Sequence, residues 1–262
     1  MNKQIILFFL LLIKVSYAVG QEDSMSYRAV YDFEYTVWAD EAKRNDKIFL
    51  DLNKDGSFCY SAYTYESDSL MNTPNGEETF RQLVTAALSK GNTTDFPHRR
   101  SKFMITKKNG QKQAIVKESI QSEVFEYTTP ICDITWTVTD SVREICGYSC
   151  FKAIGEYHGR TWEAWFTPEI PFSDGPWQLT GLPGLIVKAE DKEQLFCFTL
   201  KGFCYSPVRS DWAGKGKKTT RQGFLKLKKK DFQNSGAMAN ALLGTNGTFD
   251  SKKKAVFLET DF

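Results

Sequence analysis

Cys150 and His158 are the residues that could form a nucleophilic site, a thiol with the base that would activate it. Such catalysis needs the two side chains within hydrogen-bond reach. Along one extended strand, the step from residue 150 to residue 158 would separate them by roughly 26 Å at about 3.3 Å per residue. Only a bend would bring them together, so we predict no catalytic pair here and prefer a disulfide for Cys150.

Glu163, Glu169 and Asp174 form a second candidate, because glycoside hydrolases act through two carboxyl groups held a fixed few ångströms apart. Nothing in their spacing requires that arrangement. Glu163 is more readily explained by pairing with Arg160 or with a lysine of a neighbouring strand. Hydrolysis of glycans or peptides is therefore the alternative to a binding role, and no catalytic residue is assigned.

Metal sites are disfavoured by the residues that are present. Asp51, Asn53, Asp55 and Gly56 resemble the start of a calcium loop, but the far-end Glu and flanking helix formers are missing. A zinc site would need closely spaced CxxC pairs or more histidines than the sequence offers. We predict no metal and no cofactor, and we interpret Asp55-Gly56 as a hairpin turn.

The stretch from Gly159 to Glu190 must position most of these side chains. Alternation over residues 161–166 predicts a strand, and the apolar run that starts at Leu185 predicts another. Prolines at 168, 171 and 176 exclude regular structure between them. The turn that closes the loop is carried by Gly181, Pro183 and Gly184, with glycine where φ must be positive.

This intervening loop is too apolar for disorder, so it should be packed down and pre-formed. One interpretation is a structural lid over one end of a sheet. The other is a binding surface with rigid aromatic contacts and polar partners, since aromatic and Arg side chains anchor interfaces. Its predicted binding residues are Arg160, Glu163, Trp165, Glu169, Phe172 and Trp177.

Strand and turn signals recur about every ten residues, which is typical of a meander. They predict a mainly β (α+β) fold: a curved antiparallel sheet or half-barrel of about ten strands with one or two helices packed on it. Expected strands include residues 27–38, 48–52, 57–65, 102–106, 113–117, 124–127, 134–138, 150–157 and 195–203. A helix over 77–89 should pack in the concavity, and a later helix should run from an N-cap at Asp231 to Leu243.

The first residues predict export. Lys3, an apolar run over 5–13 and small residues at 16 and 18 are typical of a signal peptide, which we place at 1–20, with one β-rich domain over 21–262. No later integral membrane segment is predicted. The formal charge of +2 falls to about zero once Lys3 and Lys14 are removed, which argues against a nucleic-acid partner.

Exported chains meet oxidising conditions, so disulfides are plausible. The six cysteines allow 15 connectivities, and the sequence does not choose among them. The candidates for disulfide bonds are Cys132, Cys146, Cys150, Cys197 and Cys204.

Residues 181–186 read Gly-Leu-Pro-Gly-Leu-Ile, and the chain resembles the GLPGLI family, which is named after this hexapeptide. The resemblance continues upstream through Trp136, Gly147-Tyr148, Gly159-Arg160 and the run over 164–171. It implies a secreted Gram-negative bacterial protein of unassigned biochemical function. A similar domain precedes the catalytic part of some secreted peptide N-glycosidases, which implies an accessory or binding role. Where Cys146 stands, relatives often have a small or apolar residue.

Together these features predict an exported protein, periplasmic or secreted, with a non-enzymatic binding or accessory role. Its partner would be a protein, peptide or glycan at the cell envelope. The alternatives are the hydrolase considered above and a lipid or lipoprotein carrier-like binder, in which a curved sheet would hold an acyl chain on its apolar concave face. The latter rests on analogy of fold alone.

Overall fold

The structure is a computed structural model that describes residues 26–39, 42–91, 98–131, 134–207, 214–243 and 255–261. The predicted signal peptide and Cys132 lie outside these ranges. The described elements are β1 (Tyr27–Tyr35), β2 (Arg44–Asn53), β3 (Gly56–Ser61), α1 (Ala62–Met71), α2 (Gly76–Ser89), β4 (Phe103–Lys108), β5 (Gln113–Ile120), β6 (Glu123–Pro130), β7 (Trp136–Ile145), β8 (Tyr148–Tyr157), β9 (Arg160–Thr167), β10 (Leu185–Asp191), β11 (Phe196–Tyr205), β12 (Lys217–Lys218) and α3 (Arg221–Leu243).

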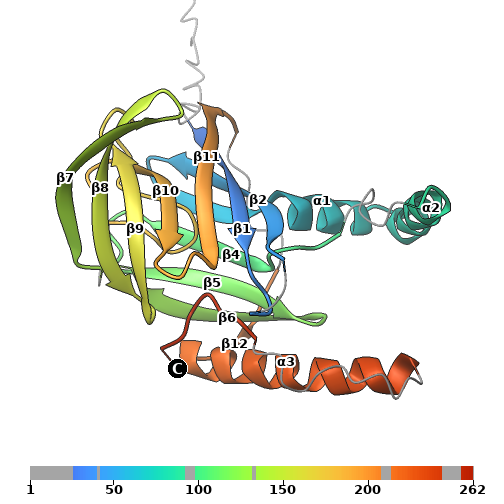
Figure 1. Cartoon of the computed structure of the whole chain (residues 1–262). Coiled ribbons are helices and arrows are strands. Elements are labelled where there is room, and N and C mark those ends of the chain that lie inside the picture. Colours follow the sequence, from blue (N-terminus) through green and yellow to red (C-terminus); the bar gives the residue numbers. More distant parts are fainter. Residues whose placement is uncertain are drawn as a thin grey trace, which may run out of the picture.

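The strands form one curled sheet of 12 strands in the order β12-β6-β5-β4-β3-β2-β1-β11-β10-β9-β8-β7. All neighbouring pairs are antiparallel except the short β12–β6 pair. The first strand thus joins two meanders, one running from β2 to β6 and one from β7 to β11. Figure 1 shows the sheet wrapping around without closing, which confirms the predicted curved sheet with few helices.

The concavity is filled by the proline loop, residues 168–184, which connects β9 to β10. Ile170, Trp177, Leu179 and Leu182 are all buried in the main hydrophobic core. The loop reaches across to β3, where the Trp177 backbone N–H donates to Cys59 Sγ at 3.2 Å. This loop therefore covers the apolar face of the sheet, as the predicted structural lid would.

The prediction that the helix over 77–89 packs in the concavity is wrong. That helix, α2, packs on α1 and lies away from the sheet (Figure 1). The cause is local: Ser61 ends β3 and caps α1, with its hydroxyl accepting from the Thr64 N–H at 3.2 Å. The chain therefore turns outward four residues before the predicted end of that strand, and α2 follows it.

The late helix α3 starts ten residues before its predicted cap, at Arg221 rather than after Asp231. The Thr220 hydroxyl accepts from the Gly223 N–H at 3.0 Å and caps the helix there. Its first turns place Phe224 and Leu225 in the core, against β6, and the ring of Phe224 stacks on Tyr127. The extra turns bring Lys228 to one open end of the half-barrel, where Phe232 also lies.

Candidate functional site

Two of the predicted binding residues lie in the core instead of on the surface. Trp177 is 2% exposed, and its ring lies 5.7 Å from that of Trp162. Trp165 is also buried, with the guanidinium of Arg143 4.1 Å from its ring centre. Because both rings are enclosed, neither forms the exposed aromatic contact that the sequence predicted.

Arg160 binds within the chain. Its guanidinium donates to Asp191 at 2.7 Å and to Glu193 at 3.0 Å, and also to the backbone carbonyl oxygens of Phe257 and Leu258. The side chain is buried, and the two carboxylates neutralise its charge. Its bonds to the two carbonyl oxygens hold the C-terminal segment, residues 255–261, against β9. The predicted interface arginine therefore acts as an internal clamp.

The remaining predicted binding residues are spread over the surface. Glu163 pairs with Lys152 at 2.6 Å, which confirms the expected lysine of a neighbouring strand. Burial would raise the pKa of Glu163, but hydrogen bonds from Lys152 and Trp165 outweigh it and leave that pKa below its ordinary value. Glu169 accepts from the Ser149 N–H at 2.7 Å, and Phe172 is half-buried.

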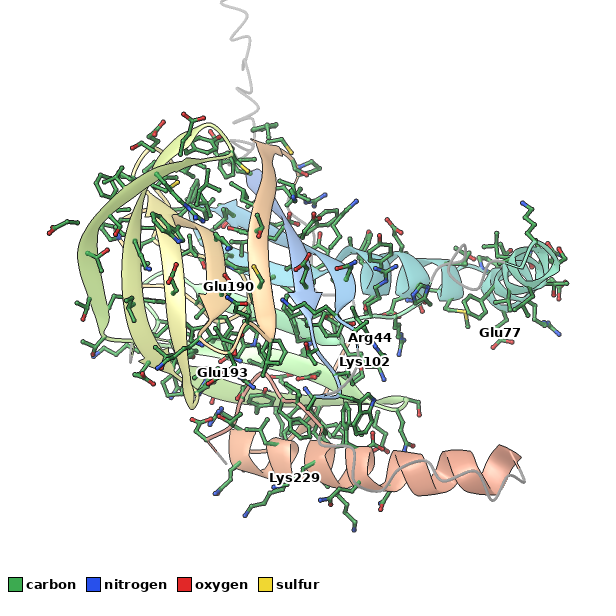
Figure 2. All side chains as sticks on the ribbon, viewed as in Figure 1. Arg44, Glu77, Lys102, Glu190, Glu193 and Lys229 are labelled. Carbon is green, nitrogen blue, oxygen red and sulfur yellow. The ribbon has the colours of Figure 1, made fainter. Side chains whose placement is uncertain are left out.

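Glu163 also lines a small groove of about 360 Å³ on the outer face of the sheet, with Glu190 and Lys192 among its neighbours. Glu190, which is labelled in Figure 2, is held like Glu163 by a lysine, Lys188 at 3.0 Å. The predicted set of binding residues is thus split among core, clamp and outer face, and the structure does not bring it together into one surface.

The glycines of the predicted turn adopt positive φ, as expected: +93° at Gly181 and +142° at Gly184. A Cβ at Gly184 would lie 2.1 Å from the carbonyl oxygen of Thr167. This close approach is available only to glycine, and it fixes the end of the proline loop beside the end of β9.

Cys146, Cys150, Cys197 and Cys204 are free thiols in the described part of the chain, as is Cys59. The local bond between Cys146 and Cys150 is therefore not formed. Cys146 instead donates to the carbonyl oxygen of Leu200 at 2.7 Å, and burial raises the pKa of the Cys150 thiol. Pairings through Cys132 lie outside the described residues.

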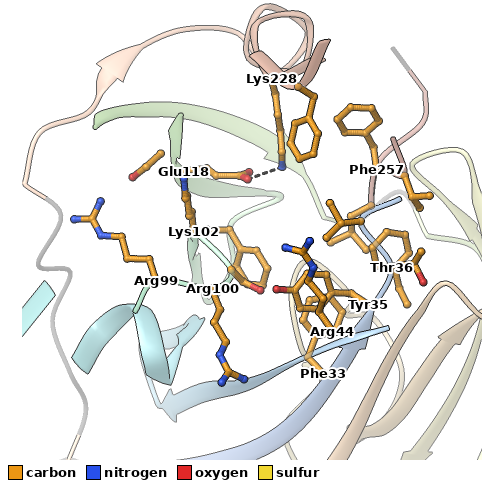
Figure 3. A pocket seen from close by; sticks show the side chains of 18 of the residues that line it. Phe33, Tyr35, Thr36, Arg44, Arg99, Arg100, Lys102, Glu118, Lys228 and Phe257 are labelled. Carbon is orange, nitrogen blue, oxygen red and sulfur yellow. Dashed lines mark hydrogen bonds and ion pairs between the residues drawn. The ribbon is translucent and has the colours of Figure 1, made fainter. Parts of the chain in front are cut away.

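A second and larger cavity, of about 670 Å³, lies at the open end of the half-barrel and is here called the mouth cavity. Ends of β1, β2, β4, β5 and β11, together with α3 and the C-terminal segment, surround it. Figure 3 shows lining side chains that come from these separate elements. Its aromatic lining consists of Phe33, Tyr35, Phe103, Phe196, Phe232 and Phe257, and its cationic lining of Arg44, Arg99, Arg100, Lys102 and Lys228.

Carboxylates neutralise part of this positive charge. Lys228 forms an ion pair with Glu118, drawn as a dashed line in Figure 3, and Arg99 pairs with Asp68 at 2.5 Å. Asp231, the other acidic residue of the lining, accepts from the Gln121 amide at 2.8 Å. The lining thus holds five Lys or Arg residues against two carboxylates and is net positive.

Next to the mouth cavity, a polar network holds the C-terminal segment. His158, Glu259 and Asp261 place their ligand atoms within 4.8 Å of one another, a spacing that could suit a metal ion. Arg221, however, binds Glu259 at 2.6 Å and also contacts Asp261, so a guanidinium already supplies the positive charge. Gln178 of the proline loop completes the network by donating to Glu259 at 3.1 Å.

The sequence analysis missed the mouth cavity because its lining comes from separate strand ends. The only local signal was the cationic run Arg99, Arg100 and Lys102, which directly precedes a strand. A cluster of cations at the start of a strand identifies a rim but does not show what lies opposite. Arg44 and Lys228, more than a hundred residues apart, complete the rim only in the folded chain.

Comparisons with known proteins match the central stretch and the fold. Residues 155–188 match a family described as "Protein of unknown function (Porph_ging)". A search of curated proteins found no match. Two solved crystal forms of PNGF-II are similar in structure, with TM-scores of 0.56 and 0.55 at 11% and 12% identity. Both cover 79% of this chain.

The chain spans about a third of the length of PNGF-II, 34% and 33% in the two crystal forms. At this identity the likeness shows the fold alone. The family match, for its part, assigns no function to residues 155–188. Among the described residues, no helix is long and apolar enough to cross a membrane.

Proposed function

We propose that this protein is a non-enzymatic binder whose mouth cavity holds a small molecule with an apolar body. The mouth cavity itself carries the proposal: about 670 Å³ of space lies between aromatic walls and a charged rim. Ligand sites in proteins are concave, mostly apolar, of about 300–1,000 Å³, and frequent at barrel mouths. Trp177 of the proline loop, by contrast, is packed in the core.

A neutral fluorescent probe, N-phenyl-1-naphthylamine, tests this proposal. We expect saturable binding with increased emission, because the probe would leave water for an apolar site. Ile120 lies at the edge of the cavity, so Ile120→Trp should fill it and weaken probe binding about tenfold or more. Ile154→Trp is the matched control, since Ile154 is 39% exposed on the outer face of β8.

Equal probe binding by the two tryptophan variants would place the probe elsewhere and remove the mouth cavity as the site. Native mass spectrometry of the purified protein gives an independent result: a bound small molecule lost in Ile120→Trp and kept in Ile154→Trp. Export, to the periplasm or beyond the cell, belongs to the same proposal. Cleavage near residue 20, found by mass spectrometry of the mature protein, would support it.

Hydrolysis of a glycan or glycopeptide is the second candidate, favoured by the likeness to PNGF-II. The carboxylates on the outer face argue against hydrolysis, because Glu163 and Glu190 are each in an ion pair with a lysine. Incubation with an N-glycosylated peptide separates the two functions. Turnover that disappears in Glu163→Gln and persists in Glu156→Gln, an exposed glutamate on β8, would replace the binding proposal with an enzyme.

A further inference from the structure

We infer that the ligand of the mouth cavity is a single-chain amphiphile with an anionic head group, a carboxylate or a phosphate. The inference rests on the proposed ligand-binding function and adds the chemical class of the ligand. Lys102 would bind the head group at the wall of the cavity, at a place here called the anion subsite, and Arg100 and Tyr35 belong to the same lining. The apolar chain would lie on the aromatic walls.

Ion pairing leaves positive charge at this subsite. Lys102 has no hydrogen bond or ion pair with any described residue, and it is half-buried at the wall of the cavity. Arg100 donates to the carbonyl oxygen of Asn45 at 2.6 Å and lies over the ring of Tyr63, 3.6 Å from its centre. Neither contact neutralises the guanidinium, and Arg100 forms no ion pair in the described part of the chain.

Tyr35 supplies a neutral donor to the same lining. Its hydroxyl has no hydrogen bond to a described residue, and Figure 3 shows the ring beside Arg44. Burial, reinforced by the carboxylate of Asp46, raises the pKa of Tyr35 although Arg44 and Arg100 oppose it. The phenol therefore stays protonated at neutral pH and can donate to an anion.

An anion would offset the desolvation cost of the cations in this lining. Cations beside apolar surface lose part of their hydration, and charge-assisted hydrogen bonds to a carboxylate or phosphate recover it. Arg and Lys bind both of these anions well. A neutral ligand would leave the charge of Lys102 unbalanced, so the structure predicts a preference for anions.

The rest of the lining favours an apolar chain over a sugar. Apart from the charged rim, the walls consist mainly of aromatic and aliphatic side chains, which offer few hydrogen bonds to hydroxyl groups: Phe33, Val37, Phe103, Ile120, Phe196, Phe232, Val256, Phe257 and Leu258. A glycan buried there would leave its hydroxyl groups unsatisfied. An acyl-type chain has no hydrogen-bonding groups to leave unsatisfied, and its contact with these walls would remove apolar surface from water.

The experiment compares dodecanoate, dodecyl phosphate and dodecanol as competitors for N-phenyl-1-naphthylamine on the full protein, below their critical micelle concentrations. These ligands share the chain and differ in the head group. We expect the anions to bind about tenfold or more tightly than the alcohol. The difference should shrink as salt is raised, because only the charged contact is screened.

Variants locate the head group. Lys102→Gln should remove most of the preference for anions, about a tenfold change, while dodecanol binding stays constant. Lys102→Arg should keep the preference, since it retains the charge. Lys108→Gln is the matched control, because Lys108 is an exposed lysine at the far end of β4 and lies outside the cavity lining. Tyr35→Phe should cause a smaller loss of anion affinity.

The possible results distinguish a failure of the anion subsite from a failure of the proposed ligand-binding function. If dodecanol binds as tightly as the anions, or if Lys102→Gln keeps the preference, the anion subsite is wrong and ligand binding stands. If neither the probe nor any dodecyl compound binds, the proposed function itself fails. A preference for one anion supports the inference and identifies the head group as carboxylate or phosphate.

Discussion

The proline loop and the mouth cavity carry similar residue types, large rings and charged groups. In the loop these side chains are packed and paired, whereas in the cavity they line open space. In the proline loop, Trp177 is enclosed and the charge of Asp174 is neutralised by buried Lys107. In the mouth cavity, rings line open space and Lys102 keeps its charge. Prolines and large aromatic residues close together in sequence therefore indicate a packed segment, whereas a binding site needs space that the fold leaves between elements.

Trp177→Ala should have the largest effect on this comparison. The side chain is fully enclosed, so its removal leaves a cavity and should lower the free energy of unfolding by about 3–5 kcal/mol, measured by urea denaturation. Phe172→Ala, at a half-buried position in the same loop, should lose about 1–2 kcal/mol. Similar small losses for both would mean that the loop is a surface after all.

The buried pair of Lys107 and Asp174 comes next. Lys107 also donates to the Gly175 carbonyl oxygen at 2.8 Å and so fixes the loop to β4. Lys107→Met leaves a poorly solvated carboxylate and should cost about 3 kcal/mol in unfolding free energy. Adding Asp174→Leu should restore part of that loss. An additive or larger loss in the double variant would contradict a charge-based explanation.

Two glycines of the same turn allow a matched test of close packing. Gly184→Ala forces a Cβ to within 2.1 Å of the backbone of Thr167, whereas at Gly181 the nearest atom lies 3.7 Å away. Both positions have positive φ, so both variants carry backbone strain of about 1 kcal/mol or more. Gly184→Ala should therefore unfold at a clearly lower temperature than Gly181→Ala, and equal melting temperatures would rule out the steric explanation.

The C-terminal segment should loosen in acid. Burial acts to raise the pKa of Asp261, but hydrogen bonds from Arg221 and His158 prevail and hold that pKa below its ordinary value. A lowered folded pKa means that the stabilisation is complete above the unfolded pKa of about 4 and is lost as the pH falls through the folded value. Because Asp261 is 38% exposed, the effect is small.

Hydrogen exchange can follow this change at one amide, the Thr260 N–H, which donates to the His158 carbonyl oxygen at 3.0 Å. After correction for intrinsic exchange, its protection should fall below pH of about 4. In Asp261→Asn, the Thr260 amide should show low protection at neutral pH as well as below pH of about 4. Protection that is independent of pH in the unaltered protein would contradict the role assigned to Asp261.

The smallest expected change concerns the mouth cavity. Lys102→Gln should alter the unfolding free energy by no more than about 0.5 kcal/mol, because the ammonium group has no partner among the described residues. The same variant should weaken anion binding, so function and stability would separate there. A large loss of stability would mean that Lys102 supports the fold, and the contrast with the proline loop would disappear.

Alternation, turn residues and positive φ are local properties, so the sheet, its hairpins and the turn at Gly181 and Gly184 could be predicted from the residues alone. The sequence also predicted the lysine partner of Glu163. The direction of α2 away from the sheet could not be predicted in this way, since a single cap at Ser61 redirects the chain. Only the tertiary structure enclosed Trp177 and assembled the mouth cavity, because burial and open space depend on contacts between residues far apart in the chain.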